Sequence, residues 1–163
     1  MTIAGRNPGT TTLSLRRSVG QGVVAGLAGS VVMTAFQRLV EMPLSGRRES
    51  YQPADLVDKA LGIRPKRDRD RRRLNYAAHF TVGAGWGAVH GAAAHATGLR
   101  GQRAVGAVFG AMWPGDVTAM TLLGLGEPPW RWSRSDLAVD VADKLVLAEA
   151  TGLVFDGLER RSG

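Results

Sequence analysis

Three stretches of the chain are apolar over the length of a membrane-spanning helix and carry small residues at four-residue spacing. They cover residues 19–40, 75–99 and 104–125. In water, a glycine inside a helix costs about 1 kcal/mol relative to alanine, so such a series disfavours a soluble helix. In lipid, small residues four apart let two helix backbones approach closely and pack. The pattern therefore predicts an all-α protein whose spanning helices pack through their small residues.

The glycines mark the face of each stretch that should meet a neighbouring helix. They are Gly22 and Gly26, extended by Ser30 and Thr34, then Gly83, Gly87 and Gly91, and finally Gly106 and Gly110. We expect these small-residue faces to nest against one another in a polytopic bundle. Association with a second copy of the chain stays open.

A fourth helical segment covers residues 137–158. Ser133, with Asp136 three residues later, matches the capping box that starts a helix. The segment crosses a membrane only if its charged residues face the bundle, pair with one another or lie near its ends. These residues are Asp140, Asp143, Lys144, Glu149 and Asp156. A spanning helix and a surface helix both stay open, so the bundle has four or three spans.

The N-terminus differs in character from the rest of the chain. Residues 1–17 are polar and are predicted to form a disordered tail, and residues 18–163 to form a single helical membrane domain. Arg16 and Arg17, placed before an apolar stretch, are also typical of a signal peptide. That stretch is followed by no small-residue cleavage site, which favours a retained first span.

Prolines predict where two of the helices are interrupted. Pro43 should end the first helix, because proline cannot continue the backbone hydrogen-bond ladder. The connector, residues 44–74, then contains a short amphipathic helix that starts near Pro53 and is capped by Gly62. We expect that helix to lie along the membrane interface. Pro114 should break the third span in its middle.

The formal net charge of +7 is concentrated in the connector. Ten of the 21 Lys and Arg residues lie within residues 47–73, and the densest run comprises Arg64, Lys66, Arg67, Arg69, Arg71, Arg72 and Arg73. Beside a span, each basic residue is attracted to anionic lipid headgroups by about 1 kcal/mol. A solvated connector whose bases pair with Asp68 and Asp70 stays the alternative. Because no nucleic-acid-binding module accompanies the run, we expect no nucleic-acid partner.

Composition and motifs exclude several kinds of chemistry. The chain has no cysteine, which removes disulfides, thiolate metal sites and cysteine nucleophiles. It contains no HExxH motif and no nucleophile elbow, and its glycines follow helix packing rather than a phosphate-binding loop. We therefore expect a protein that is not an enzyme and that holds no cofactor and no metal.

Two histidines of the second span share one face of the helix. At 100° per residue, His79 and His90 differ by only about 20° around the helix axis. Ionisable groups inside a membrane are costly, so this face should point into the bundle. The imidazoles either hydrogen-bond a neighbouring helix or handle protons or ions. A shared metal ion is disfavoured, because the two residues lie about 16 Å apart along the axis.

Acidic residues of the later helices could join these histidines. Asp116 follows the predicted break, so it either caps the second half of a broken helix or serves as a protonatable carboxylate beside a histidine. Asp140 and Lys144 are four residues apart with the acid first, the favoured order for an ion pair within a helix. The candidate internal polar cluster therefore comprises His79, His90, Asp116, Asp140 and Lys144.

Several motifs, taken in order, resemble the YagU-like family of small bacterial inner-membrane proteins. They are the glycine-rich first span, Glu41-x-Pro43-Leu44 at its end, His79 opening the next span, Gly-Leu-Gly-Glu-Pro-Pro at residues 124–129 and the acidic start of the last helix. The resemblance covers most of residues 20–150. Lys144 stands where a histidine is expected. The resemblance implies a multi-pass protein of the bacterial inner membrane, linked to acid or envelope stress, and it supplies no catalytic residue.

Two functions of different classes follow from these expectations. In the first, the internal cluster conducts or senses protons or small ions. In the second, the protein organises anionic lipids through its basic connector, and its buried polar groups only hold helices together. With four spans, the first and third connectors carry more Lys and Arg than the segments on the other side. This bias favours a cytoplasmic location for the basic connector.

Overall fold

The computed structural model describes residues 8–161, with side chains from residue 15 onward, and every regular element in that range is helical. The elements are α1 (Pro8–Phe36), the π-helical turn η1 (Gln37–Glu41), α2 (Met42–Ser45), α3 (Gln52–Leu61), α4 (Asp68–Thr97), α5 (Gln102–Leu122), the 3₁₀ turn η2 (Pro129–Arg131) and α6 (Arg134–Arg160). The predicted all-α class is confirmed.

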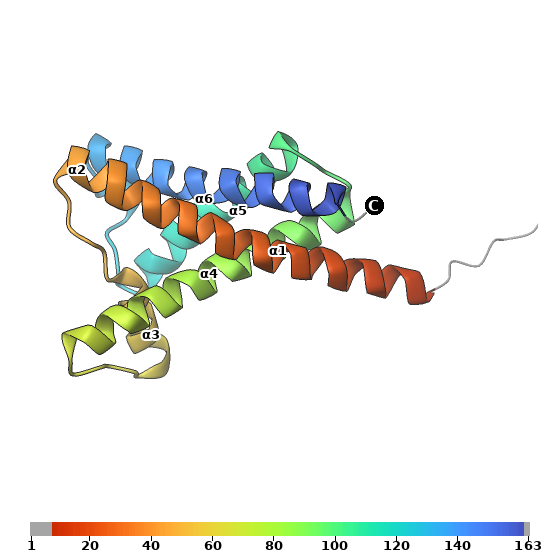
Figure 1. The fold of residues 1–163 in the computed structure, drawn as a ribbon. Helices are drawn as coiled ribbons and strands as arrows, with labels where there is room; N and C mark the ends of the chain where they lie inside the picture. Colours follow the sequence, from red (N-terminus) through yellow and green to blue (C-terminus); the bar gives the residue numbers. More distant parts are fainter. Residues whose placement is uncertain (1–7, 162–163) are drawn as a thin grey trace, which may run out of the picture.

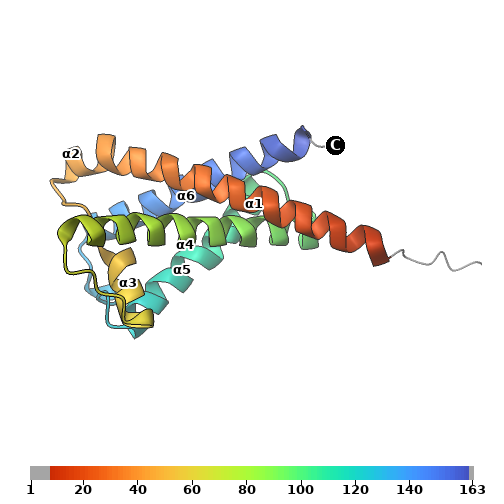
Figure 2. The same cartoon turned by 60° about the horizontal axis from the view of Figure 1, so that its bottom comes forward.

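Four long helices run back and forth along the length of the molecule (Figure 1). α1 crosses α4 and lies beside α6, and α5 packs against α6 and α4. The beginning of α1 and the end of α6 lie at one end of the molecule, whereas α2 and α3 lie at the other (Figure 2). Toward that second end α1 and α4 diverge, which leaves room between them for side chains of the other helices.

The crossing of α1 and α4 is made by glycines of both helices. A Cβ atom added to Gly22 would meet the carbonyl oxygen of Gly87, and one added to Gly26 would meet that of Gly83. Farther along the same seam, Gly91 lies against the backbone of Ser18. The two backbones are therefore in direct contact, as the small-residue spacing on these two helices predicts.

The glycines of α5 take no part in such a contact. A Cβ atom at Gly106 or Gly110 would meet nothing within 4 Å in the described structure, so the expected nesting through these two residues is wrong within one chain. α5 instead meets α6 through bulkier side chains, Val105, Met112, Leu147 and Ala148. Side chains of this size hold the two helix axes farther apart, so glycine on α5 is not needed for the contact.

Close approaches to α6 use glycines that spacing did not single out. A Cβ atom at Gly29 of α1 would meet the Thr151 hydroxyl, and one at Gly152 of α6 would meet the side chain of Val105. Each of these glycines stands outside the four-residue series of its helix. Only the placement of α6 against α1 and α5 makes them contact positions.

Both predicted proline breaks are absent. Helix passes from α1 through η1 and α2 to Ser45, and Pro43 is accommodated in α2, directly after the π-helical turn. In that turn the Met42 N–H donates to the Gln37 carbonyl, five residues back, so the hydrogen-bond ladder is already shifted before proline interrupts it. α5 likewise continues through Pro114 without an interruption.

Helix starts also differ from the expected boundaries. α1 begins at Pro8, so residues 8–17 are helical where a disordered tail was predicted; residues 1–7 lie outside the described part of the chain. α4 begins at Asp68, so most of the basic run forms its first turns rather than a connector. Acidic side chains favour a helix N-terminus, and Asp68 and Asp70 occupy the first turn of α4.

The amphipathic helix of the connector is confirmed as α3, and it packs on α4. α3 ends at Leu61 and is capped by Gly62, which has the left-handed φ of 68° that favours glycine. Its Ala54 is buried and donates its backbone N–H to Asn75 Oδ1 of α4 at 3.1 Å. The Asn75 Nδ2 in turn donates to the Ser50 carbonyl at 2.9 Å. α3 is therefore docked on the first half of α4.

One continuous helix in residues 8–161, Leu15–Ser45, is long and apolar enough to cross a membrane, with a mean hydropathy of 1.6. α4, α5 and α6 have 30, 21 and 27 residues, but none of them contains an 18-residue window that is equally suited to crossing a membrane in hydropathy and charge. Only 28% of the apolar window of Leu15–Ser45 is buried inside the molecule. This helix is therefore exposed along much of its apolar surface.

Gly87→Ala should destabilise the fold, because its Cβ would press on the carbonyl oxygen of Gly22 and the backbone of Gly26. We expect a loss of about 1–3 kcal/mol, the usual cost of overpacking a tight contact. Gly85→Ala is the matched control on the same helix, since a Cβ there meets nothing within 4 Å. Thermal unfolding of the detergent-solubilised protein, followed by circular dichroism, measures both. Equal melting temperatures for the two variants would contradict a backbone contact at Gly87.

Candidate functional site

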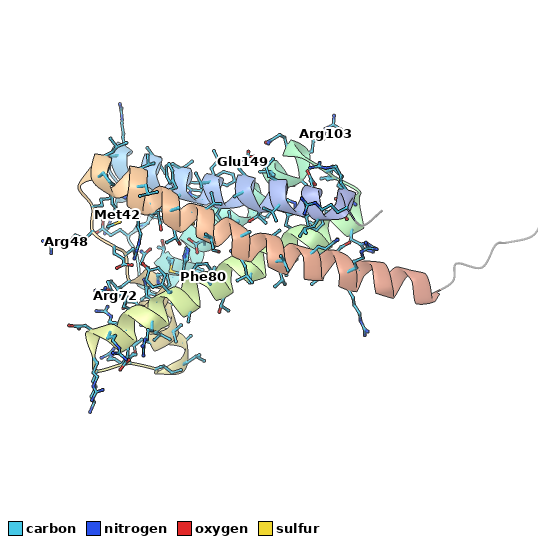
Figure 3. The ribbon with its side chains drawn as sticks, in the orientation of Figure 1. Met42, Arg48, Arg72, Phe80, Arg103 and Glu149 are labelled. Atoms are coloured by element: carbon cyan, nitrogen blue, oxygen red, sulfur yellow. The ribbon has the colours of Figure 1, made fainter. Side chains whose placement is uncertain are left out.

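A cavity of about 690 Å³ opens where α1 and α4 diverge. Its walls come from the end of α1, from η1, α3, α4, α5 and α6, and from the segment between α2 and α3. Figure 3 shows side chains from these elements gathered at that end of the molecule, with Met42 and Arg48, which both line the cavity, labelled. The cavity is therefore bounded by every long helix of the bundle.

An ion triad occupies one wall of the cavity. Lys144 Nζ lies 3.0 Å from Asp116 Oδ2 and 2.5 Å from Asp140 Oδ1. Asp140 is one turn before Lys144 on α6, as the sequence spacing predicts, and Asp116 reaches them from α5. The Lys144 side chain is only 15% exposed. Trp113 Nε1 also donates to Asp140 Oδ2 at 2.9 Å, so both Asp140 oxygens are engaged.

Asp143 lies beside this triad and faces α1. Its Oδ2 accepts a hydrogen bond from Gln37 Nε2 of the π-helical turn at 2.7 Å. Asp143 is 9% exposed, and its Oδ1 has no hydrogen-bond partner among residues 8–161. A buried polar atom without a partner is costly, and among the atoms of this kind in the described residues Asp143 Oδ1 is the one whose residue lines the cavity.

Sequence reasoning left Gln37 and Asp143 out of the polar cluster. Asp143 could have been found, because it lies three residues after Asp140 and both side chains therefore project toward one side of α6. Nothing in the sequence indicates Gln37, because its orientation depends on the π-helical turn. Such turns frequently occur at functional sites.

His79 belongs to the cavity but does not reach the carboxylates. Its Nε2 lies 3.3 Å from Thr34 Oγ1 of α1, and the Thr34 hydroxyl itself donates to the Ser30 carbonyl at 2.8 Å. Because that hydroxyl hydrogen is already used, Thr34 accepts from His79, which places a proton on Nε2. The predicted link between His79 and a neighbouring helix is present.

His90 lies away from the cavity. It is 1% exposed and packs edge-on against the Phe155 ring, with 5.1 Å between the ring centroids. His79 and His90 share one face of α4, yet three helical turns separate them, and α1 crosses between these levels through its glycines. The expectation of one cluster containing both histidines is therefore wrong.

Asp116 has neither of the roles that the sequence suggested. The helix around it is unbroken, so it caps no second half-helix, and its ion pair with Lys144 takes the place of a pair with either histidine. The physical reason is proximity: α6 packs on α5 and carries its lysine directly opposite Asp116.

The deep part of the cavity carries surplus negative charge. Asp116, Asp140 and Asp143 line it together with one cation, Lys144. Near the segment between α2 and α3, Arg47 bonds Asp136, and Arg38 contacts Glu49 and the Tyr76 hydroxyl. Arg48, Glu41 and Glu127 also line the cavity and have no ion pair within the described residues. In the part of the chain that the structure describes, no group of three or more acidic or histidine side chains is arranged to hold a metal ion.

The basic run is split between paired and unpaired residues. Arg64 and Arg71 bond Asp58 and Asp55 of α3, and Arg73 pairs with Asp70. The Asp58 carboxylate raises the pKa of Arg64 above its usual value by accepting its hydrogen bond. Within the described range, the exposed residues without an ion pair include Lys66, Arg67 and Arg69.

Comparison with known proteins supplies no template for this cavity. The chain matches no family model, no curated protein and no solved structure. The resemblance to YagU-like proteins stays a prediction, and what the cavity does must be inferred from its own side chains.

Proposed function

We propose that this chain is a multi-pass membrane protein that handles protons or small cations at its internal cavity. The observation that carries the proposal is the set of four ionisable side chains held between the helices, Asp116, Asp140, Asp143 and Lys144. Ionisable groups inside a membrane are costly, and those that occur usually serve an ion or substrate pathway. Here they line a cavity rather than only joining two helices.

The outer surface supports a lipid environment for the whole bundle. Large apolar side chains are exposed on all four long helices: Val24, Val31, Val32 and Leu39 near or within α1, Val82 and Val89 on α4, Leu122 at the end of α5, and Leu145 and Leu153 on α6. Scattered exposure of this kind is favourable in hydrocarbon and unfavourable in water. Because α1 contacts α4 and α6, lipid around α1 also surrounds these neighbours.

We therefore propose four spans in alternating directions. Asp140, Asp143 and Lys144 of α6 face the cavity, and Glu149 bonds Gln102 of α5, which weakens the main objection to its spanning. The exposed Trp130, beside Arg131 in the turn between α5 and α6, suits the level of the lipid headgroups. We place the α2 and α3 end in the cytoplasm of a bacterial cell, because that side carries the basic run.

Labelling of single introduced cysteines tests this topology. The chain has no cysteine of its own, so no native residue of this protein reacts with the label. Exposed positions Ser45, Thr97 and Ser135 serve as reporters. With four spans, Ser45→Cys and Ser135→Cys should react with a membrane-impermeant maleimide only after the cytoplasmic face is opened. Thr97→Cys should react in intact cells. Labelling of all three from one side would contradict four spans.

Flux through the cavity is testable in liposomes that enclose a pH-sensitive dye. The wild-type protein should dissipate an imposed proton or cation gradient faster than protein-free liposomes. Asp116→Asn should slow this dissipation by about tenfold, because it removes one charge from the ion triad while keeping the side-chain shape.

Glu149→Gln is the control for that experiment, because Glu149 bonds Gln102 on the outer side of the bundle. It should leave the rate unchanged. Equal rates with wild-type protein and with empty liposomes would remove proton and cation transport as the function.

A second function, the organisation of anionic lipids, is favoured by the exposed basic residues without an ion pair around the start of α4. At low salt, phosphatidylglycerol should stabilise the protein by about 1 kcal/mol for each of Lys66, Arg67 and Arg69. Replacing all three by Gln should abolish this stabilisation. The paired residues Arg64 and Arg71, replaced in the same way, should change it less. Melting temperatures in phosphatidylglycerol and phosphatidylcholine nanodiscs measure the difference. If neither variant alters lipid dependence, the basic run is only a solvated surface.

A further inference from the structure

We propose that the cavity binds a protonated organic amine with an apolar body, and that Asp143 is the carboxylate that receives its ammonium group. This inference rests on the proposed function, because it names the class of cation that the cavity takes. The supporting observations are the size of the cavity, the chemistry of its walls and the unpartnered oxygen of Asp143.

The size of the cavity indicates a molecule rather than a bare ion. Its volume of about 690 Å³ lies within the roughly 300–1,000 Å³ of pockets that hold organic ligands. A proton needs no such space. A bare metal ion needs several converging ligands, and no group of three acidic or histidine residues converges anywhere in residues 8–161.

The walls combine an apolar surface with an aromatic ring. The apolar lining includes Met33, Val82, Trp86, Met112, Met120 and Leu147. Methionine side chains adapt to the shape of different apolar groups. The indole of Trp86 offers a ring face over which a cation is favoured. An organic body can therefore pack here while its charged end stays beside the acidic residues.

The charges that line the cavity determine whether it favours a cationic or an anionic ligand. Lys144 is already neutralised by Asp116 and Asp140, and this triad keeps one net negative charge. Asp143 adds a second, and within the described residues its carboxylate accepts a side-chain hydrogen bond only from the neutral Gln37. The whole lining holds seven carboxylates and four cationic side chains, so an anion placed here would meet surplus negative charge. A cation would meet a favourable field.

Asp143 carries the specific contact. It is 9% exposed, it lines the cavity, and its Oδ1 lacks a hydrogen-bond partner in the described part of the chain. An ammonium group donates N–H hydrogen bonds and carries the opposite charge, so it provides a buried carboxylate with both a hydrogen-bond donor and a counter-charge. Gln37 holds the other oxygen and fixes the orientation of the acceptor.

Binding can be measured by calorimetry on the full-length protein in phosphatidylcholine nanodiscs. The probes are 1-naphthylmethylammonium, the neutral 1-naphthalenemethanol and the anionic 1-naphthoate, which share one ring system and differ in charge. We expect the ammonium compound to bind at least about tenfold more tightly than the alcohol, a difference of about 1.4 kcal/mol. Naphthoate should bind most weakly.

Two matched variants assign the effect to Asp143. Asp143→Asn keeps the shape and an acceptor for Gln37 but removes the charge, and should weaken binding of the ammonium probe about tenfold while leaving the alcohol unchanged. Asp156→Asn is the control: Asp156 is on the same helix and also has an unpartnered Oδ1, but it lies outside the cavity lining. It should bind both probes as wild type does.

The outcomes separate this inference from the proposed function. Equal affinity for the ammonium compound and the alcohol, or unchanged amine binding by Asp143→Asn, overturns the inference even if proton flux is measured. Amine binding that depends on Asp143 supports the inference even if liposomes show no flux, and the proposed transport would then be wrong. A melting curve of Asp143→Asn that matches wild type shows that lost binding does not come from unfolding.

Discussion

Direct backbone contact between α1 and α4 is the constraint on which the rest of the structure depends. Gly22 and Gly26 of one helix meet Gly83 and Gly87 of the other with no side chain between them. Two helices held this closely at one level must diverge beyond it, and the divergence is visible toward α2 and α3 (Figure 1). The cavity lies in the space that this crossing opens.

Charged residues of α6 line that cavity, and the π-helical turn that follows α1 supplies Gln37, which hydrogen-bonds one of them. Lys144 is held by two carboxylates, so the lysine neutralises part of the charge that the acidic residues bring between the helices. Gln37 reaches Asp143 where the helical ladder of α1 is shifted by one residue. The same irregular turn lets the helix continue through Pro43. This one π-helical turn therefore both allows the helix to continue to Ser45 and orients Gln37 toward Asp143.

Local patterns predicted those features that depend on neighbours in the chain. The Ser133 capping box, the Asp140–Lys144 pair and the Gly62 cap all form, because each involves residues within about one helical turn. The expected breaks at Pro43 and Pro114 do not form. The π-helical turn shifts the hydrogen-bond ladder ahead of Pro43, and in α5 tertiary packing outweighs the local penalty of Pro114.

The sequence by itself determined the all-α class, the glycine faces of α1 and α4 and the residue types that carry charge. Only the tertiary structure decided which of those residues meet. His79 reaches the cavity and His90 does not, although the helical period puts both on one face. Gly106 and Gly110 share the spacing of the other glycines, but a Cβ added there would meet nothing within 4 Å among the described residues. Periodicity fixes a direction around one helix axis, whereas the crossing and divergence of several helices fix which partner lies in that direction and at what depth.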